Sequence, residues 1–182
     1  MRLISRPLPG MLVLQVEPRV DQRGYFARCF CRTELAQWGV TAPIEQANLS
    51  FSERALTLRG LHYQVGPSAE TKVVTCLQGS LHDVVLDLRV DSPTFGEHAV
   101  VELSGSSKRL LVIPPGCAHG FMTRENATLL LYMVSSAYDP TRERAVRWDD
   151  PGFAIAWPDQ PRAISPRDAA IPDFDPGHHL AA

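Results

Sequence analysis

The 182-residue sequence predicts a mainly β protein, a jelly-roll barrel or β-sandwich with a few short helices. Two observations favour this fold class. Short segments with strand-like alternation of hydrophobic and polar residues recur along the chain, and clusters of Gly, Pro, Asp and Ser separate them. The composition, 45% hydrophobic and 21% charged, is ordinary for a globular protein of this length. We therefore expect one domain that spans residues 1–182.

The expected strands occupy residues 12–16, 25–31, 72–77, 81–88, 99–103, 109–113 and 129–134. The segment 81–88 shows the period most clearly, because Val84 and Leu86 alternate with Asp83 and Asp87 as in a half-buried strand. Many short strands bounded by turn residues, together with few helices, indicate a β-sandwich or jelly-roll barrel.

Two further segments complete the expected fold. A short helix is predicted to begin at Thr33, whose hydroxyl can cap it, and to stop at Gly39. The residues from about 159 to 182 are rich in Pro, Asp and Ala. They are expected to form a tail that wraps the barrel as loose chain or short helical turns.

Charge and hydropathy limit the kinds of partner. Eighteen basic and twenty acidic residues give a net charge of −2, which provides no basic surface for nucleic acid or an anionic membrane. Pro7, Pro9 and Gly10 interrupt the apolar N-terminal segment, so it is neither a signal peptide nor a membrane span. We expect a cytoplasmic protein, and a few placed arginines would suffice for a small anionic ligand.

A local motif suggests chemistry on carbon. Residues 59–64 read Arg-Gly-Leu-His-Tyr-Gln, and Lys72, one of only two lysines, follows His62 by ten positions. A neutral imidazole can remove a proton from carbon, and an ammonium can stabilise the charge that develops on a neighbouring carbonyl oxygen. On spacing alone, the competing interpretation is a structural strand histidine and a solvated surface lysine.

A second motif raises the question of a metal. Residues 114–120, Pro-Pro-Gly-Cys-Ala-His-Gly, have the P-x-G-x-x-H form of the second metal-binding segment of cupins. A metal cupin also carries H-x-H and a carboxylate in its first segment. The corresponding place here is His62-Tyr63-Gln64, which lacks one histidine. We therefore expect no metal and no other cofactor, although His62, His82 and His119 could converge; His82 is interpreted as a core histidine.

Several motifs in a fixed order resemble the dTDP-4-dehydrorhamnose 3,5-epimerase family of nucleotide-sugar enzymes over roughly residues 20–170. They are RGLHYQ at 59–64, KVVTCLQGSLHDVVLDLRVDSPTFG at 72–96, IPPGCAHGF at 113–121, Leu131-Tyr132, Tyr138-Asp-Pro and Trp148-Asp-Asp-Pro. The resemblance implies a metal-free, cupin-type jelly roll that forms homodimers. It also implies an isomerase that acts without a cofactor on a nucleoside-diphosphate 4-keto-6-deoxyhexose, converting dTDP-4-dehydro-6-deoxy-D-glucose to dTDP-4-dehydro-L-rhamnose.

The resemblance also implies roles for four catalytic residues. His62 matches the general base, and Asp168 matches the carboxylate that orients it, with Asp83 as the competing partner. Tyr132 matches the acid on the other face of the sugar, and Lys72 matches the residue near the C4 oxygen. This agrees with the chemistry inferred above, because a C4 ketone acidifies the hydrogens on C3 and C5 and inversion requires a proton donor on the opposite face.

Substrate-binding positions follow in the same way. Arg59 and Arg23 are expected to hold the diphosphate, since a guanidinium matches phosphate oxygens in a bidentate manner. Phe26 matches an aromatic residue near the base. The other positions that match the ligand groove are Gln46, Asn48, His119, Tyr138 and Arg167.

Some alternatives stay open at the level of sequence. The stretch Tyr25-Phe26-Ala27-Arg28 has a cation where family members usually have a glutamate, so the base could be that of a dTDP, GDP or CDP sugar. Inversion could occur at C3, C5 or both. A sugar-nucleotide 3,4-ketoisomerase, a metal-dependent cupin oxygenase and a non-catalytic sugar-binding cupin share the fold. The co-occurrence of a base, an acid and a lysine argues against the last of these.

Overall fold

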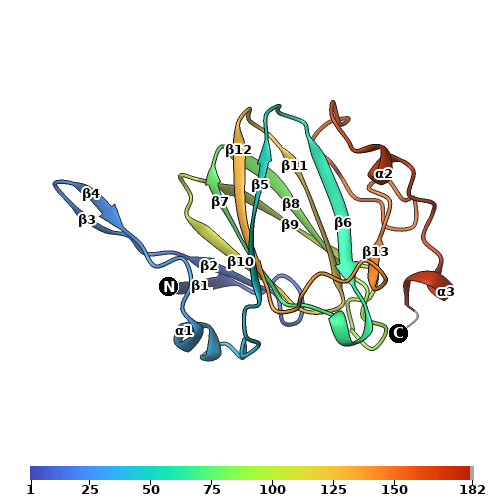
Figure 1. The fold of residues 1–182 in the computed structure, drawn as a ribbon, viewed down its shortest axis with the longest axis horizontal. Coiled ribbons are helices and arrows are strands. Elements are labelled where there is room, and N and C mark those ends of the chain that lie inside the picture. The colour runs from blue at the N-terminus through green and yellow to red at the C-terminus, as the bar shows by residue number, and fades with distance from the viewer. Residues whose placement is uncertain (181–182) are drawn as a thin grey trace.

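The computed structural model describes residues 1–180, which form two facing antiparallel sheets, a separate hairpin and a few short helices (Figure 1). The larger sheet contains, in spatial order, β1 (Arg2–Ser5), β2 (Leu12–Gln15), β10 (Arg109–Ile113), β7 (Lys72–Gln78), β12 (Thr128–Val134) and β5 (Gln46–Ser52). The smaller sheet contains β13 (Glu143–Ala145), β6 (Leu58–Gln64), β11 (Cys117–Thr123), β8 (Ser80–Asp87) and β9 (His98–Ser104). This architecture confirms the predicted mainly β, jelly-roll fold class.

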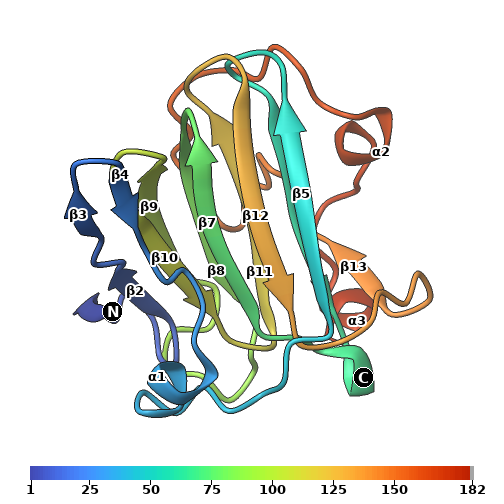
Figure 2. The same cartoon turned by 60° about the vertical axis from the view of Figure 1, so that its left-hand side comes forward.

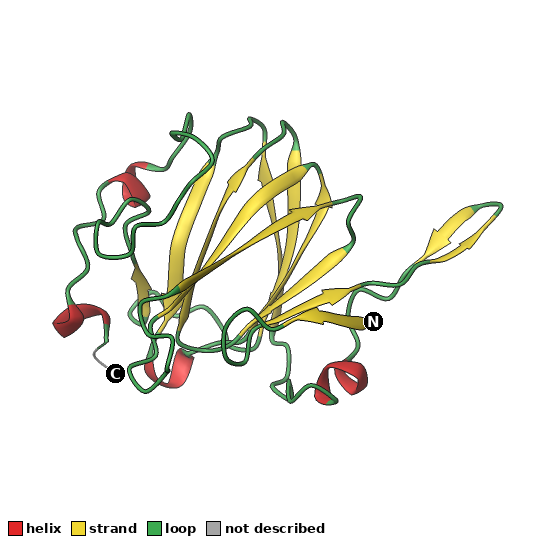
Figure 3. Cartoon of the chain, turned by 180° about the vertical axis from the view of Figure 1, so that it is seen from behind, coloured by secondary structure: helices red, strands yellow, loops and turns green. Residues whose placement is uncertain are grey.

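The remaining elements lie outside the two sheets. The hairpin of β3 (Arg19–Asp21) and β4 (Gly24–Phe26) extends away from both sheets (Figure 3). Figure 2 shows β5 at the free edge of the six-stranded sheet. The helical segments are α1 (Arg32–Ala36), α2 (Pro166–Ala169), α3 (Pro176–His179) and a 3₁₀ turn at Gly66–Ser68. None of the helices within residues 1–180 has the length and apolar character needed to cross a membrane.

Apolar side chains from both sheets form the central core. The inner faces contribute Val13, Val74 and Leu111 from the larger sheet and Leu81, Val85 and Phe121 from the smaller one. Burial of such side chains is the main favourable term in folding, at about 25 cal/mol per Å² of apolar surface. The core therefore fixes the separation of the two sheets and, with it, the width of the space at the end of the barrel that carries polar residues.

The outer faces of the sheets are covered by the two ends of the chain. Helix α1 and the N-terminal segments pack on the larger sheet, where Leu35 joins Leu12 and Leu14. The C-terminal segment packs on the smaller sheet, where Phe153, Phe174 and other apolar residues meet Val84, Leu86 and Leu88. The short helices α2 and α3 lie within this segment, and residues 181 and 182 of the expected tail lie outside the described residues.

The structure corrects three local predictions. The strand predicted at residues 25–31 ends at Phe26, and the chain then runs irregularly into α1. That helix begins after Cys31 without a side-chain cap, so Thr33 lies inside it. Strand β8 alternates as expected, but it is not half-buried. Both of its faces are buried, because the C-terminal segment covers the outer face.

Two glycines set the close packing of β6 against β11. Gly60 has a φ of +103°, and a Cβ atom there would lie 2.6 Å from the Cα of Gly120 and 2.6 Å from the carbonyl oxygen of His119. Only glycine fits this backbone angle and this approach. The register places His62 of β6 opposite His119 of β11, so the glycine pair brings two histidines to the same end of the barrel.

Candidate active site

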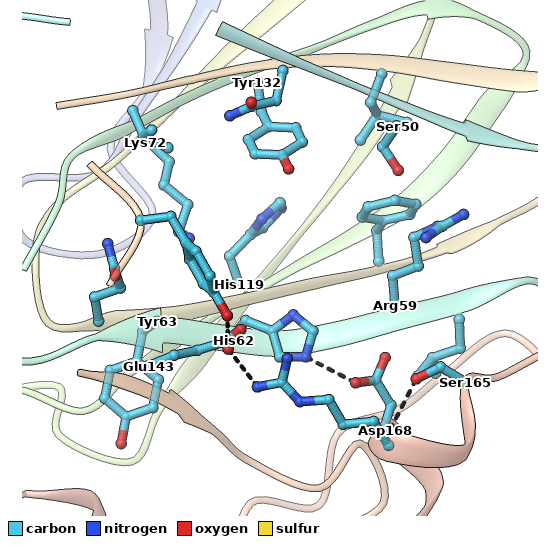
Figure 4. Close-up of a pocket in the computed structure, with 18 of the residues that line it drawn as sticks. Ser50, Arg59, His62, Tyr63, Lys72, His119, Tyr132, Glu143, Ser165 and Asp168 are labelled. Carbon is cyan, nitrogen blue, oxygen red and sulfur yellow. Dashed lines mark hydrogen bonds and ion pairs between the residues drawn. The ribbon is translucent and has the colours of Figure 1, made fainter. Parts of the chain in front are cut away.

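A pocket of about 770 Å³ opens between the two sheets. Residues of six strands and of the C-terminal segment line it, and Figure 4 shows their side chains converging. Ten of the twelve predicted site residues lie here: Gln46, Asn48, Arg59, His62, Lys72, His119, Tyr132, Tyr138, Arg167 and Asp168. The sequence motifs that carry them are far apart in the chain, and the fold brings them together.

His62 and Asp168 form a hydrogen-bonded pair on the wall made by the smaller sheet. The Nε2 atom of His62 lies 2.9 Å from Oδ1 of Asp168, which is almost fully buried. The Oγ atom of Ser165 accepts a hydrogen bond from the Asp168 backbone N–H at the start of α2, and this cap holds the backbone of Asp168 in place. Burial alone would raise the pKa of Asp168, but the bond to His62 lowers it below its usual value.

Each of the two histidines in the pocket is hydrogen-bonded to a different aspartate. Asp83, the competing partner for His62, instead contacts Nε2 of His119 at 2.9 Å. Asp83 is completely buried, and burial raises its pKa against the opposing effect of His119. His82 lies outside the pocket, buried against Trp157 and bonded through Nδ1 to Glu102, as expected for a core histidine.

Tyr132 stands on the opposite wall. It lies on β12 of the larger sheet and faces the pocket across from His62 (Figure 4). Burial raises the pKa of its hydroxyl, the nearby Glu70 carboxylate raises it further, and Arg59 opposes both. The phenol therefore stays protonated at neutral pH and can donate a proton.

Cations line the same pocket. Lys72, the first residue of β7, is mostly buried, and its Nζ lies 2.5 Å from Oε1 of Glu70. Arg59 donates to the Phe51 carbonyl at 3.0 Å and to Ser52 Oγ at 3.3 Å, so its side chain is held along the pocket wall. These groups can stabilise negative charge on a bound ligand.

A cluster around Glu143 forms the rim. Its Oε2 accepts a hydrogen bond from the Tyr138 hydroxyl at 2.8 Å and pairs with Arg167. Strand β13 pairs with β6, and the register sets Glu143 beside Gln64, two residues from His62. The cluster therefore orients a tyrosine and an arginine at the entrance of the pocket.

Two predicted binding residues lie elsewhere. Arg23 is on the exposed hairpin, where it pairs with Asp21, and Phe26 is 65% exposed at the end of β4. Neither lines the pocket of this chain. Arg28 follows β4, is largely exposed and contacts Glu34 at 3.4 Å.

Sequence reasoning missed several lining residues, among them Glu70, Glu143, Ser50 and Ser165. Glu70 stands two residues before Lys72, and this proximity was the one available signal. The position of Glu143 depends on the pairing of β13 with β6, which no local pattern reveals. Within residues 1–180, no group of three or more His, Cys, Asp or Glu side chains is arranged to hold a metal ion.

The fold and pocket are those of a cupin-type enzyme with a histidine and a tyrosine on facing walls. The model of the family dTDP-4-dehydrorhamnose 3,5-epimerase matches residues 5–176. A dTDP-4-dehydrorhamnose 3,5-epimerase from Salmonella typhimurium is 37% identical over 177 residues, 96% of each chain. A dTDP-4-dehydrorhamnose 3-epimerase from Streptomyces niveus is 38% identical over 169 residues, 92% of this chain and 81% of the relative.

A solved structure points to the same family. The dTDP-4-dehydrorhamnose 3,5-epimerase of Bacillus anthracis, crystallised with TDP and PPi, superposes with a TM-score of 0.92 at 36% identity and covers 95% of this chain and 99% of its own. The chain belongs to the dTDP-4-dehydrorhamnose 3,5-epimerase family, and the resemblance seen in the sequence motifs is confirmed.

Proposed function

We propose that the protein inverts C3, C5 or both in a dTDP-4-keto-6-deoxyhexose, with dTDP-4-dehydro-6-deoxy-D-glucose as substrate and dTDP-4-dehydro-L-rhamnose as product. The observation that carries the proposal is the position of His62 and Tyr132 on facing walls of one pocket. Inversion at carbon needs a base on one side of the sugar ring and an acid on the other. A binding protein would have no need for this arrangement.

His62 is the base in this proposal. A carboxylate is acceptor-only, so the Nε2–H of His62 donates to Asp168 and Nδ1 is the atom left to take a proton. The C–H electron pair then moves toward the C4 carbonyl and forms an enolate. The Lys72 ammonium stabilises the negative oxygen, since a fixed charge in a partly buried site acts more strongly than water.

Tyr132 completes the inversion. Its O–H bond breaks as a new C–H bond forms on the opposite face, and the enolate electrons return to carbon. The product has the same atoms as the substrate, while Tyr132 is left as a phenolate and His62 as an imidazolium. Exchange of protons with solvent restores both groups, so no oxidant, reductant or cofactor enters the balance.

The two predicted binding residues outside the pocket support a homodimer. Arg23 and Phe26 can meet the ligand only if the hairpin of one subunit reaches the pocket of another. The exposed apolar residues Leu49 and Phe51 on the free edge strand β5, and Val20 and Tyr25 on the hairpin, provide apolar surface for such an interface. The expected cytoplasmic location stays a prediction.

Proton NMR in heavy water tests the proposed reaction. Incubation with the 4-keto-6-deoxyhexoses of dTDP, GDP and CDP should replace the C3 signal, the C5 signal or both with deuterium for at least the dTDP sugar. The same spectra distinguish single from double inversion and would reveal the 3-keto product of a ketoisomerase. Absence of exchange with all three substrates would contradict the proposal, and elemental analysis of the purified protein would test the oxygenase alternative.

A further inference from the structure

Glu70 is a buried carboxylate that the reaction described above does not use. It lies between the 3₁₀ turn Gly66–Ser68 and β7, lines the pocket, and its side chain is only 7% exposed. A buried carboxylate needs a partner to offset its desolvation. Glu70 has two, and both belong to the walls of the pocket.

Each oxygen of Glu70 is engaged. Oε1 accepts from Nζ of Lys72 at 2.5 Å, and Oε2 accepts from Nε2 of Gln64 at 2.9 Å. Gln64 lies on β6, and its own Oε1 accepts the Asp139 backbone N–H at 2.7 Å. Glu70 therefore ties a residue of the smaller sheet to the first residue of β7 in the larger one.

We infer that Glu70 is a positioning residue that fixes the Lys72 ammonium in the pocket and presents a negative charge to the Tyr132 hydroxyl. The inference rests on the proposed function, because it acts through Lys72 and Tyr132. Glu70 is not itself the base, since both of its oxygens are occupied by donors from the protein.

The charge of Glu70 is expected to restrict the motion of Lys72 and to keep Tyr132 protonated. An ammonium bound to a fixed carboxylate loses the freedom of a long lysine side chain and stays where the C4 oxygen is expected. Tyr132 lines the same pocket as Glu70, and strand pairing sets Val134 of its strand opposite Lys72, so the negative charge of Glu70 disfavours the phenolate and keeps Tyr132 in its acid form. The ionisable side chains that share the pocket with Tyr132 are Arg59, His62, Tyr63, Glu70, Lys72, His119, Tyr138, Glu143, Arg167 and Asp168.

The test compares wild type with Glu70→Gln, which keeps the shape of the side chain and an acceptor for Gln64 but removes the charge. The chain has four tyrosines, so NMR of protein labelled at the tyrosine ring carbon gives few signals, and Tyr132→Phe identifies the one that matters. Without substrate, the Tyr132 signal should titrate at a lower pH in Glu70→Gln than in wild type. Glu97→Gln, which removes an exposed carboxylate outside the pocket, should leave the titration unchanged.

A second readout follows Lys72 directly. Only Lys72 and Lys108 give side-chain signals after ¹⁵N-lysine labelling, and Lys108 serves as an internal control. The ammonium protons of Lys72 should exchange with water more slowly than those of Lys108 in wild type, and this difference should be lost in Glu70→Gln. Glu70→Asp restores the charge and should partly recover both the Tyr132 titration and the slow exchange of the Lys72 ammonium protons. Such recovery would show that the changes in Glu70→Gln do not come from misfolding.

The results separate the two proposals. Under turnover, the alkaline limb of kcat should move to lower pH in Glu70→Gln, in step with the Tyr132 titration. An unchanged Tyr132 titration together with an unchanged Lys72 exchange rate would overturn the assignment of Glu70. If wild type failed to exchange substrate hydrogen, the proposed function would fall, whereas the substrate-free NMR would still decide whether Glu70 positions Lys72 and Tyr132.

Discussion

The His62–Asp168 pair joins a residue of the C-terminal segment to a residue of strand β6. Asp168 lies over a hundred positions from His62 in the chain, yet its carboxylate contacts His62 and accepts a hydrogen bond from the Gly60 backbone N–H. The sequence could suggest the pairing only through the family motif. Asp83 was the competing carboxylate partner for His62 in the sequence, and in the structure it is hydrogen-bonded to His119 instead.

The Asp168 pair should also contribute to stability in a pH-dependent way. The folded pKa of Asp168 is lowered, so its stabilisation is present above the usual aspartate pKa of about 4 and is lost as pH falls through the lower folded value. Asp168→Asn should therefore be less stable than wild type near neutral pH, and the gap should narrow in acid. Urea unfolding at a series of pH values measures this, and a gap that widened in acid would contradict it.

Arg59 should strengthen the binding of every nucleoside diphosphate, whichever nucleobase the ligand carries. Arg59→Ala should weaken dTDP, GDP and CDP alike, by about 1.5–3 kcal/mol, the scale of a hydrogen bond to a charged group. Isothermal titration calorimetry with the three diphosphates measures the effect. Arg124→Ala, which changes an arginine outside the pocket, is the matched control and should bind as wild type does. A loss confined to one nucleotide would show that Arg59 contacts the base.

At the scale of elements, the strands with regular alternation were predictable and those with special packing were not. Segments 72–77, 81–88, 99–103, 109–113 and 129–134 match β7, β8, β9, β10 and β12 to within one residue at each end. Strands β6 and β11, which carry His62 and His119, were missed as strands. Gly60 and Gly120 break their local signal, and the reason for those glycines is a contact between the two strands.

That contact gives a prediction for β6. Gly60→Ala should destabilise the protein more than Gly24→Ala, since both glycines have positive φ but only Gly60 would clash with a neighbouring strand. Backbone strain alone costs about 1–3 kcal/mol, which sets the expected loss for Gly24→Ala. Equilibrium unfolding of both variants provides the comparison, and equal losses would show that the approach of β6 to β11 is not tight.

At the scale of the whole molecule, the proposed homodimer gives a prediction about subunit mixing. If the hairpin of one subunit completes the pocket of its partner, mixing inactive Arg23→Ala with inactive His62→Asn should restore about a quarter of wild-type activity after subunit exchange. The recovered activity comes from mixed dimers, in which one of the two pockets is intact. Mixing Arg59→Ala with His62→Asn should restore none, because both residues line the pocket of the same chain. Recovery in neither mixture would place Arg23 outside the site.

The central claim is that His62 and Tyr132 act from opposite walls of the pocket, and hydrogen exchange in heavy water separates their roles. His62→Asn should abolish both deuterium uptake and inversion, because no proton leaves carbon without the base. Tyr132→Phe should retain deuterium uptake while inverted product falls by about 10²- to 10⁴-fold, the usual effect of removing a positioned acid. Wild-type exchange in His62→Asn, or equal loss of exchange and inversion in Tyr132→Phe, would contradict the account.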